Sequence, residues 1–117
     1  MHEAGPQIPA GVARALSRFR AALEGRFGNR LRELVLYGSY ARGEATEDSD
    51  VDVLVVVRGL TDEERREVFD LAYDANAAET ESWAGLSPLV HSEQHARELR
   101  SRERLLYREI DHDKVIV

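Results

Sequence analysis

Two short apolar segments, separated by a polar link, dominate the hydrophobic pattern of the chain. Residues 34–37 are β-formers that end at Gly38, so they predict a strand that leads into a tight turn. Residues 51–57 form the most β-prone segment, and their nearly continuous hydrophobicity predicts a strand covered on both faces. Between the strands, residues 41–43 predict a short helical turn and residues 44–49 an exposed loop.

Apolar residues at intervals of three or four predict an amphipathic helix on either side of this pair of strands. The first helix runs from about Pro9, which suits the first turn of a helix, to Phe27. The second begins after Thr61, which forms a capping-box pattern with Glu64, and runs to about Glu81. Both apolar stripes are interpreted as core packing. They consist of Ile8, Val12, Leu16, Phe19, Leu23 and Phe27, and of Val68, Leu71, Ala72 and Ala75.

The last third of the chain predicts a strand, two helices and an apolar end. After a turn at residues 83–85, residues 86–90 predict a short strand, and Pro88 favours the edge of the sheet because it cannot donate to a ladder. A helix capped by Ser92 is expected to continue to about residue 99, followed by a final helix over residues 102–110. Residues 115–117 predict a last strand or a surface that covers a partner. The apolar residues of the final helix are Leu105, Leu106 and Ile110.

Together these elements predict an α/β (α+β) fold in which helices pack on a small mixed sheet of three to four strands. At 117 residues the chain fits a single domain with a real core and leaves no room for a second. We expect residues 1–8 to form a loose tail, residues from about 9 to 91 to form the core, and residues 92–117 to add the C-terminal helices.

The composition of the chain argues against several classes of function. With 43% hydrophobic and 32% charged residues, the chain resembles an ordinary soluble globular protein. The net charge of −6 argues against direct nucleic-acid binding through phosphate neutralisation. The absence of cysteine excludes disulfides and thiolate metal sites. No apolar run approaches membrane-spanning length and the first residues lack a signal-peptide pattern, so we expect a cytoplasmic protein without membrane contact.

Asp50 and Asp52 introduce the second strand, and side-chain alternation points both carboxylates the same way. Two neighbouring carboxylates repel each other, and a shared divalent cation is the usual resolution. Gly38 and Ser39 form a turn nearby that offers backbone N–H groups and a hydroxyl to an anion. A metal beside an anion-binding turn indicates a nucleoside triphosphate bound with magnesium. The alternative is that the two aspartates only satisfy loop N–H groups.

These residues resemble a known family pattern. Residues 38–43, Gly-Ser-Tyr-Ala-Arg-Gly, and residues 49–52, Ser-Asp-Val-Asp, are similar to the GSxARG…SDxD motif of the nucleotidyltransferase superfamily related to DNA polymerase beta. The small size points to the minimal nucleotidyltransferase branch, which includes antitoxins. The order of elements extends the similarity from about Val12 to Val90. The resemblance implies a polymerase beta-like fold and magnesium-dependent transfer of a nucleoside monophosphate.

The resemblance also implies roles for individual residues. Asp50 and Asp52 would be the catalytic, metal-binding pair, and the bound metal would neutralise charge on the phosphates. Arg42 has two interpretations, neutralising the triphosphate or bracing the acidic loop, and we favour the second slightly. Ser49 either holds the loop or touches phosphate. The implied nucleotide-binding residues are Gly38, Ser39, Arg42 and Ser49, and the possible loop partners of Arg42 are Glu44, Glu47 and Asp48.

One departure from the family pattern concerns a third carboxylate. Active members typically have another acid on the third strand, where it completes metal binding and helps to deprotonate the acceptor. Here that strand contains no acid, and Ser87 occupies the expected position. Glu79 and Glu81 precede the strand, would need an unusual bend to reach the site, and are interpreted as a solvated face. The departure bears on catalysis and leaves nucleotide binding untouched.

Two histidines near this strand suggest other chemistry. His91 has the chemistry of a base, although a lone histidine at a strand end is more often structural. His91 and His95 have the spacing of a helical metal pair. The predicted boundary between strand and helix falls between them, so we expect that they do not share a face.

The leading hypothesis is a transferase that moves AMP from ATP to a hydroxyl group. A chain of this size lacks the additional domain with which larger relatives hold an acceptor, so the acceptor must lie on a partner or a second subunit. The resemblance implies a helical HEPN-type toxin as the partner, modified on a tyrosine hydroxyl; self-association is the other option. The alternative function is a nucleotide-binding module, weak or inactive in catalysis, that neutralises its partner by contact.

Overall fold

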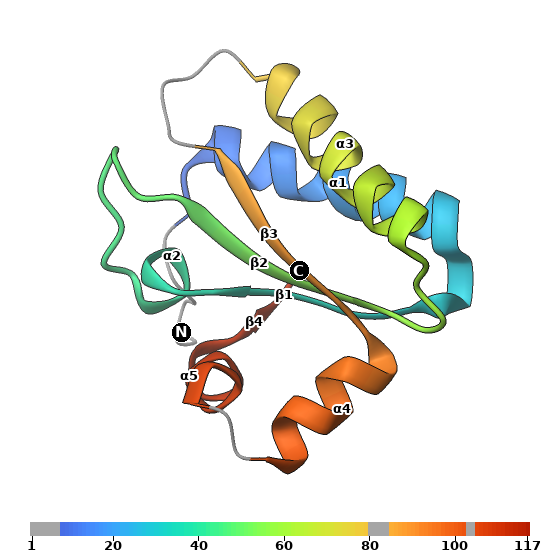
Figure 1. The fold of residues 1–117 in the computed structure, drawn as a ribbon. Helices are drawn as coiled ribbons and strands as arrows, with labels where there is room; N and C mark the ends of the chain where they lie inside the picture. Colours follow the sequence, from blue (N-terminus) through green and yellow to red (C-terminus); the bar gives the residue numbers. More distant parts are fainter. Residues whose placement is uncertain (1–7, 80–84, 103–104) are drawn as a thin grey trace.

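The computed structural model describes residues 8–79, 85–102 and 105–117, and in this part of the chain four strands form one mixed sheet with helices on both faces (Figure 1). The predicted fold class is confirmed. In chain order the elements are α1 (Ala10–Phe27), a 3₁₀ turn (Gly28–Arg30), β1 (Leu31–Tyr37), α2 (Ser39–Arg42), β2 (Val51–Val57), α3 (Asp62–Ala77), β3 (Leu86–Ser92), α4 (Glu93–Ser101), α5 (Leu105–Asp113) and β4 (Val115–Ile116).

The sheet has the strand order β3-β2-β1-β4. β1 is antiparallel to both β2 and β4, and β2 is parallel to β3. β3 is an edge strand, as Pro88 predicted, and residues 115–116 add the other edge. In the register of the sheet, Asp52 lies opposite Tyr37 on one side and beside Ser87 on the other.

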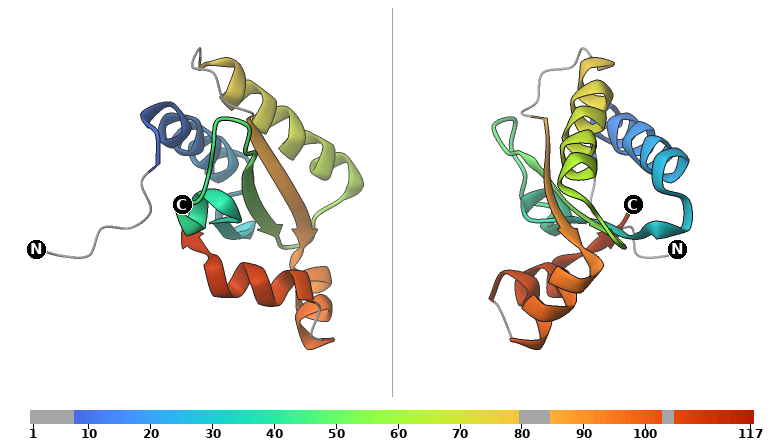
Figure 2. Two further views of the ribbon diagram at one scale, coloured as in Figure 1. Left: turned by 90° about the vertical axis from the view of Figure 1, so that its left-hand side faces the viewer. Right: turned by 45° about the vertical axis from the view of Figure 1, so that its right-hand side comes forward.

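Both faces of β2 are covered, as its hydrophobic run predicted. The side chains of Val51, Val53 and Val55 join the core cluster formed with α1 and α3. Leu54 and Val56 point to the opposite face and join the cluster formed with α4 and α5. The views in Figure 2 show the two helix pairs on opposite sides of the sheet. The alternation places Asp52 on the same face as Leu54, toward the C-terminal helices.

β1 begins three residues earlier than the apolar run predicted. The apolar pattern did not extend to Arg32 and Glu33 because these residues are charged. In the structure both are paired with helix residues. Arg32 Nε donates to Glu93 at 3.0 Å, and Arg100 Nη1 donates to Glu33 at 2.6 Å. Ion pairs therefore allow charged residues to lie in a strand next to two packed helices.

α3 begins with the predicted capping box. The Thr61 side chain accepts a hydrogen bond from the Glu64 N–H, and the Glu64 carboxylate accepts one from the Thr61 N–H. Arg30 also donates to Glu64 and is the main cause of the low pKa of this carboxyl, about 2. The helix therefore starts at a position that two side chains and two backbone groups fix together.

α3 ends at Ala77, earlier than the predicted end near Glu81. Asn76 explains the difference, because its side-chain oxygen accepts a hydrogen bond from the N–H of Leu86 at 3.0 Å and ties the helix end to β3. Glu79 is not part of a solvated face: its side chain is only 4% exposed and it pairs with Arg14 and Arg18 of α1. Glu81 and the predicted turn at residues 83–85 fall largely outside the described residues.

The C-terminal helices exist as predicted, with small shifts in their bounds. Leu105 and Leu106 are 68% and 43% exposed, whereas Tyr107 and Ile110 are buried. The Tyr107 hydroxyl has a buried partner, Nδ1 of His91 at 2.8 Å. The polar contact turns the tyrosine toward the sheet. Among the described helices, none is both long and apolar enough to cross a membrane.

The capping box predicts a measurable loss. Thr61→Ala should lower the free energy of unfolding by about 1 kcal/mol, because it leaves the Glu64 N–H without its acceptor at the start of α3. Thr61→Ser keeps the hydroxyl and is the matched control. Chemical denaturation monitored by circular dichroism measures both, and equal stability of the alanine and serine variants would contradict the role of the cap.

Candidate functional site

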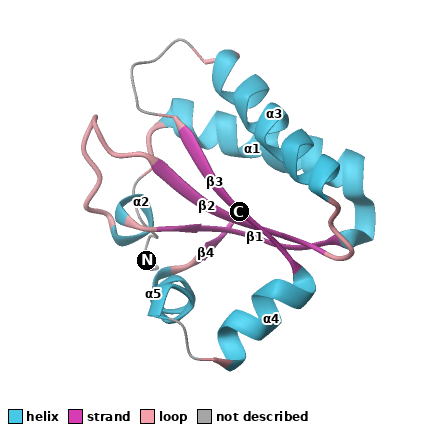
Figure 3. Cartoon of the chain, in the orientation of Figure 1, coloured by secondary structure: helices cyan, strands magenta, loops and turns pink. Residues whose placement is uncertain are grey.

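The motif turn lies at the end of the sheet where β1 stops and β2 begins. Gly38 separates β1 from α2, and the loop from residue 43 to residue 50 returns the chain to β2 (Figure 3). Because β2 and β3 are parallel, the first residues of β3 lie at the same end. Three strands and α2 therefore meet where the sequence predicts the site.

Gly38 and Asp52 approach each other closely across the β1–β2 pair. Gly38 has a φ of 80° and a ψ of −155°, a conformation that is nearly exclusive to glycine. A Cβ atom on Gly38 would collide with Oδ2 of Asp52 and would lie 3.2 Å from its Cγ. Glycine is therefore required both by the backbone conformation and by the carboxylate that lies against it.

Asp50 and Asp52 are electrostatically coupled. Asp50 is exposed, whereas Asp52 is half-buried. Burial raises the pKa of Asp52 above its ordinary value, the negative charge of Asp50 adds to this effect, and the positive charge of Arg42 opposes it. A divalent cation would offset this cost of ionisation. The pair fits magnesium, which takes one or two carboxylates and keeps several waters.

The two motif serines make different contacts. Ser39 is the first residue of α2, and its backbone carbonyl accepts a hydrogen bond from the N–H of Glu44 at 2.9 Å. Ser49 lies in the loop before β2, and its Oγ accepts a hydrogen bond from the N–H of Thr46 at 2.9 Å. The contact agrees with the interpretation that Ser49 holds the loop. Contact of either serine with phosphate stays a prediction.

Arg42 makes two ion pairs. Its Nε donates to Glu44 at 3.0 Å and its Nη1 donates to Asp113 at 2.9 Å. Of the three acids considered as loop partners, Glu44 is the one that pairs with it within the described part of the chain. The contacts agree with the bracing interpretation, and they also keep the guanidinium close enough to Asp52 to affect its pKa.

Two residues near the acids were not singled out from the sequence. Asp113 at the end of α5 pairs with Arg42, and no local pattern links residues 71 positions apart. Tyr37 lies opposite Asp52 on the same face of the sheet. Burial, and then the charge of Asp52, raises its pKa. The position of Tyr37 could have been inferred, since it is the last residue before the turn.

The position beside Asp52 on the third strand is Ser87, as the sequence suggested. The two residues are partners in the parallel β2–β3 register, and Ser87 is exposed. Among residues 8–79, 85–102 and 105–117, no three histidine or acidic side chains gather into a group that would hold a metal ion. The structure therefore brings together two acids, a glycine turn and a serine, without a third carboxylate from the described residues.

Comparison with protein families identifies the family of the chain. The model of the nucleotidyltransferase domain family matches residues 16–114, which include every element from the middle of α1 to the end of α5. The chain belongs to this family. The match covers the Gly-Ser turn, the paired aspartates and the C-terminal helices together.

Individual relatives of this nucleotidyltransferase domain match over shorter segments. The protein adenylyltransferase MntA of Thermococcus cleftensis is 55% identical over 40 residues, which are 34% of this chain and 38% of that protein. A "putative protein adenylyltransferase" of Methanocaldococcus jannaschii is 44% identical over 43 residues, 37% of this chain and 43% of that protein. The matches thus span less than half the length of these two relatives.

A solved structure described as a "putative nucleotidyltransferase from Sulfolobus solfataricus" is also similar to this domain. It is 22% identical, with a TM-score of 0.40, and the similarity covers 94% of this chain and 87% of that one.

The histidines of this nucleotidyltransferase domain lie together, against expectation. The rings of His91 and His95 are 4.7 Å apart, because β3 continues to Ser92 and α4 turns back at once. His91 is buried, and its Nδ1 is paired with the Tyr107 hydroxyl. Burial, with the nearby charges of His95 and Arg65, lowers the pKa of His91 to about 4. A buried histidine paired with tyrosine has a structural role here.

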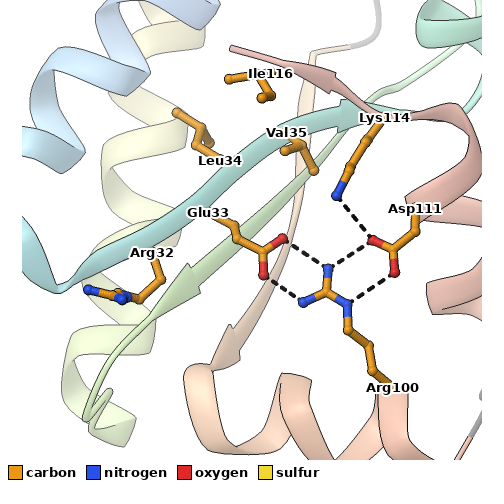
Figure 4. Close-up of a pocket in the computed structure, with 8 residues that line it drawn as sticks. All are labelled: Arg32, Glu33, Leu34, Val35, Arg100, Asp111, Lys114 and Ile116. Atoms are coloured by element: carbon orange, nitrogen blue, oxygen red, sulfur yellow. Dashed lines mark hydrogen bonds and ion pairs between the residues drawn. The ribbon is translucent and has the colours of Figure 1, made fainter.

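A hollow of about 360 Å³ lies elsewhere, between β1, β4 and the C-terminal helices (Figure 4). Four of its charged groups are paired with one another, and Arg32 is paired with Glu93. The Arg100 guanidinium lies between the carboxylates of Glu33 and Asp111, at distances of 2.6 to 3.1 Å, and Lys114 lies 3.5 Å from Asp111. This network joins α4 and α5 to β1, so we interpret it as structural.

The contact between Gly38 and Asp52 predicts different costs at two glycines. Gly38→Ala should lower the free energy of unfolding by about 2–4 kcal/mol, because a Cβ adds a collision to backbone strain. Gly43→Ala is the matched control, since its φ of 75° also favours glycine but nothing lies within 4 Å of a Cβ there. It should cost about 1–2 kcal/mol. Chemical denaturation measures both, and equal losses would show that the carboxylate makes no close contact.

Proposed function

We propose that this nucleotidyltransferase domain transfers a nucleoside monophosphate, most simply AMP from ATP, to a protein hydroxyl in a magnesium-dependent reaction in the cytoplasm. The observation that supports the proposal is the half-buried carboxylate of Asp52, coupled to Asp50 and placed against the backbone of Gly38. Such a pair is costly in the protein alone and becomes favourable with a cation and a polyphosphate beside it.

The proposal assigns a role to each motif residue. Asp50 and Asp52 hold the magnesium ion, which would neutralise charge on the phosphates and orient the α-phosphorus. Gly38 makes room for the Asp52 carboxylate against the turn, and the turn faces the phosphate oxygens. Ser39 contributes a hydroxyl or backbone N–H to them. The proposed roles of Ser49 and Arg42 are to hold the loop and to add positive charge near the phosphates.

A protein is the proposed acceptor because the chain is similar in sequence to a relative that is named a protein adenylyltransferase. MntA of Thermococcus cleftensis is named a protein adenylyltransferase, and its matching segment is 55% identical to this chain. A helical HEPN-type protein, modified on a tyrosine in a toxin–antitoxin pair, is therefore the proposed partner, with a second copy of the chain as the other option.

A second function is favoured by one observation. Ser87, and no acid, lies beside Asp52 on β3, and serine is neither a good magnesium ligand nor a base. A domain without the third acid would bind nucleotide and neutralise its partner by contact, with little or no transfer. The two functions differ in whether AMP becomes covalently attached to the partner.

Asp52→Asn distinguishes the transferase from the binding module. With ATP labelled at the α-phosphate, magnesium and the co-purified partner, the wild type should label the partner and the variant should not, because the variant loses a metal ligand. Titration calorimetry should show magnesium-dependent ATP binding to the wild type and its loss in the variant. Tight association without label, unchanged in Asp52→Asn, would support the binding module.

The same variant must remain folded for this result to count. The pKa of Asp52 is higher in the folded protein than its ordinary value. Ionisation of this carboxyl therefore lowers the free energy of unfolding as the pH rises through that pKa, and the loss persists at neutral pH. Asp52→Asn should therefore be at least as stable as the wild type at pH 7, with a smaller advantage at acid pH. Thermal unfolding at several pH values measures this. An unstable variant would indicate that the pair has a structural role.

Ser87→Asp tests whether the missing acid limits transfer. An aspartate in register with Asp52 would add a metal ligand and a base, so transfer to the partner should rise by about tenfold or more. The measurement is the initial rate of label incorporation at saturating ATP. Ser87→Asn, which adds similar volume without charge, is the control. An unchanged rate in Ser87→Asp would rule out the missing acid as the limiting factor.

A further inference from the structure

Ser87 lies at the position on β3 that is nearest in register to the paired acids. It is the partner of Asp52 in the parallel β2–β3 ladder, and neighbouring strands lie about 4.8 Å apart. Residues in register on adjacent strands point to the same face of a sheet. The Ser87 side chain therefore leaves the sheet on the same side as the Asp52 carboxylate, one strand away.

The Ser87 hydroxyl is available for reaction. Ser87 is exposed, and within the described part of the chain its side chain makes no hydrogen bond or other polar contact. Its backbone is well held nevertheless. The carbonyl of Gly85 accepts a hydrogen bond from Val51 at 2.9 Å, and Leu86 donates to the Asn76 side chain at 3.0 Å. The Ser87 hydroxyl, without a polar partner among the described residues, thus stands on a fixed section of strand beside Asp52.

Other hydroxyls fit the same role less well. Ser49 Oγ is already bonded to the Thr46 N–H, and Tyr37 is half-buried. Tyr73 is 71% exposed but lies on α3, which packs on the opposite face of the sheet from Asp52. Ser87 combines exposure, the absence of a partner among the described residues, and a place on the face of the acids.

We propose that Ser87 is itself an acceptor, so that the domain adenylylates its own β3 strand in cis. The proposal rests on the proposed function, because the nucleotide must first bind at the paired acids. The Ser87 Oγ attacks the α-phosphorus of ATP and forms a phosphodiester bond to AMP. The bond between the α-phosphorus and its bridging oxygen breaks, pyrophosphate leaves, and the hydroxyl proton passes to water.

This reaction explains why a serine at this position is compatible with a working site. A third acid would deprotonate the hydroxyl of an acceptor that binds from solution. A serine in the same sheet does not have to bind first, and its fixed proximity offsets part of the missing base catalysis. The product places AMP over the entrance to the acids. Each chain should therefore accept one AMP, and the modified chain should no longer bind magnesium-ATP.

The covalent product provides the first test. The purified chain, incubated with ATP and magnesium, should gain the mass of one AMP, and peptide mass spectrometry should locate it on Ser87. Ser87→Ala should reduce the gain to background, and Ser87→Thr should retain it because threonine keeps the hydroxyl. Ser17→Ala removes an exposed serine on α1 and should retain it too. Modification of another residue, or persistence in Ser87→Ala, would overturn the proposal.

Mixing two variants tests transfer within one molecule. Asp52→Asn keeps Ser87 but lacks a metal ligand, and Ser87→Ala keeps the acids but lacks the acceptor. Neither variant should gain AMP alone, and a mixture of the two should also remain unmodified, because the acids and the acceptor lie on different chains. Intact mass distinguishes the two variants. AMP on Asp52→Asn in the mixture would show transfer between chains and overturn the assignment in cis.

A spectroscopic measurement tests the geometry without turnover. The chain contains no cysteine, so Ser87→Cys provides a single site for a trifluoromethyl label. Mn²⁺ in place of magnesium should broaden the fluorine signal at position 87, and Asp52→Asn should abolish the broadening. A label on Ser17→Cys, on a helix that packs on the opposite face of the sheet, should be broadened less. Equal broadening at both positions, or none at position 87, would contradict the proximity of Ser87 to the metal site.

The outcomes separate this proposal from the proposed function. If calorimetry shows magnesium-dependent ATP binding and the partner is labelled, while the chain itself gains no AMP, self-modification is overturned and the transferase function stands. If the wild type binds no magnesium-ATP, both are overturned. AMP on Ser87 that depends on Asp52 supports self-modification and nucleotidyl transfer at the paired acids, and labelling of the partner is then the separate test of transfer to another protein.

Discussion

The Asp52 carboxylate lies against the backbone of Gly38, and the geometry of the candidate site depends on this contact. It requires glycine at the turn, both for the φ of 80° and for the absence of a Cβ. It also depends on the antiparallel register that sets Asp52 opposite Tyr37. A shift of one residue would turn the carboxylate to the other face of the sheet and would put the valines of β2 in the wrong core.

The two-sided sheet explains how a charged pair is kept at the end of an apolar strand. β2 is buried on both faces along its length, so it is a rigid support, while Asp50 lies beyond the strand in solvent. The C-terminal helices pack on the same face as Asp52. Through the ion pair of Asp113 with Arg42, α5 also holds the motif arginine near the acids. The C-terminal helices thus take part in the electrostatics of the site.

A single position on β3 connects the functional proposals. Ser87 lies beside Asp52, where an acid would complete the proposed metal site, and its neutral hydroxyl changes the chemistry available there. Without the third carboxylate, transfer to an outside hydroxyl lacks a base, which favours a binding module. Because the Ser87 hydroxyl has no polar partner among the described residues, we propose that it attacks the nucleotide within the same chain. The chain is acidic, with a net charge of −6, so in the proposed function the positive charge beside Asp50 and Asp52 comes from the bound metal ion.

The sequence by itself determined the order of elements, the mixed sheet, the capping box at Thr61 and the edge position of Pro88. These features follow from local periodicity and from the backbone chemistry of single residues. The sequence also brought Gly38 and Asp52 together as a motif, because the motif lies within one hairpin-like connection between neighbouring strands.

Only the tertiary structure decided which distant groups complete these features. Arg42 and Asp113, which form an ion pair, are 71 positions apart. Tyr107 is buried because its hydroxyl shares a hydrogen bond with His91, which lies on another element. Charged Arg32 and Glu33 lie in β1 because helix residues pair with them. The physical reason is the same in each case: a polar side chain is buried or ordered according to the partner that the fold brings to it, and periodicity contains no information about that partner.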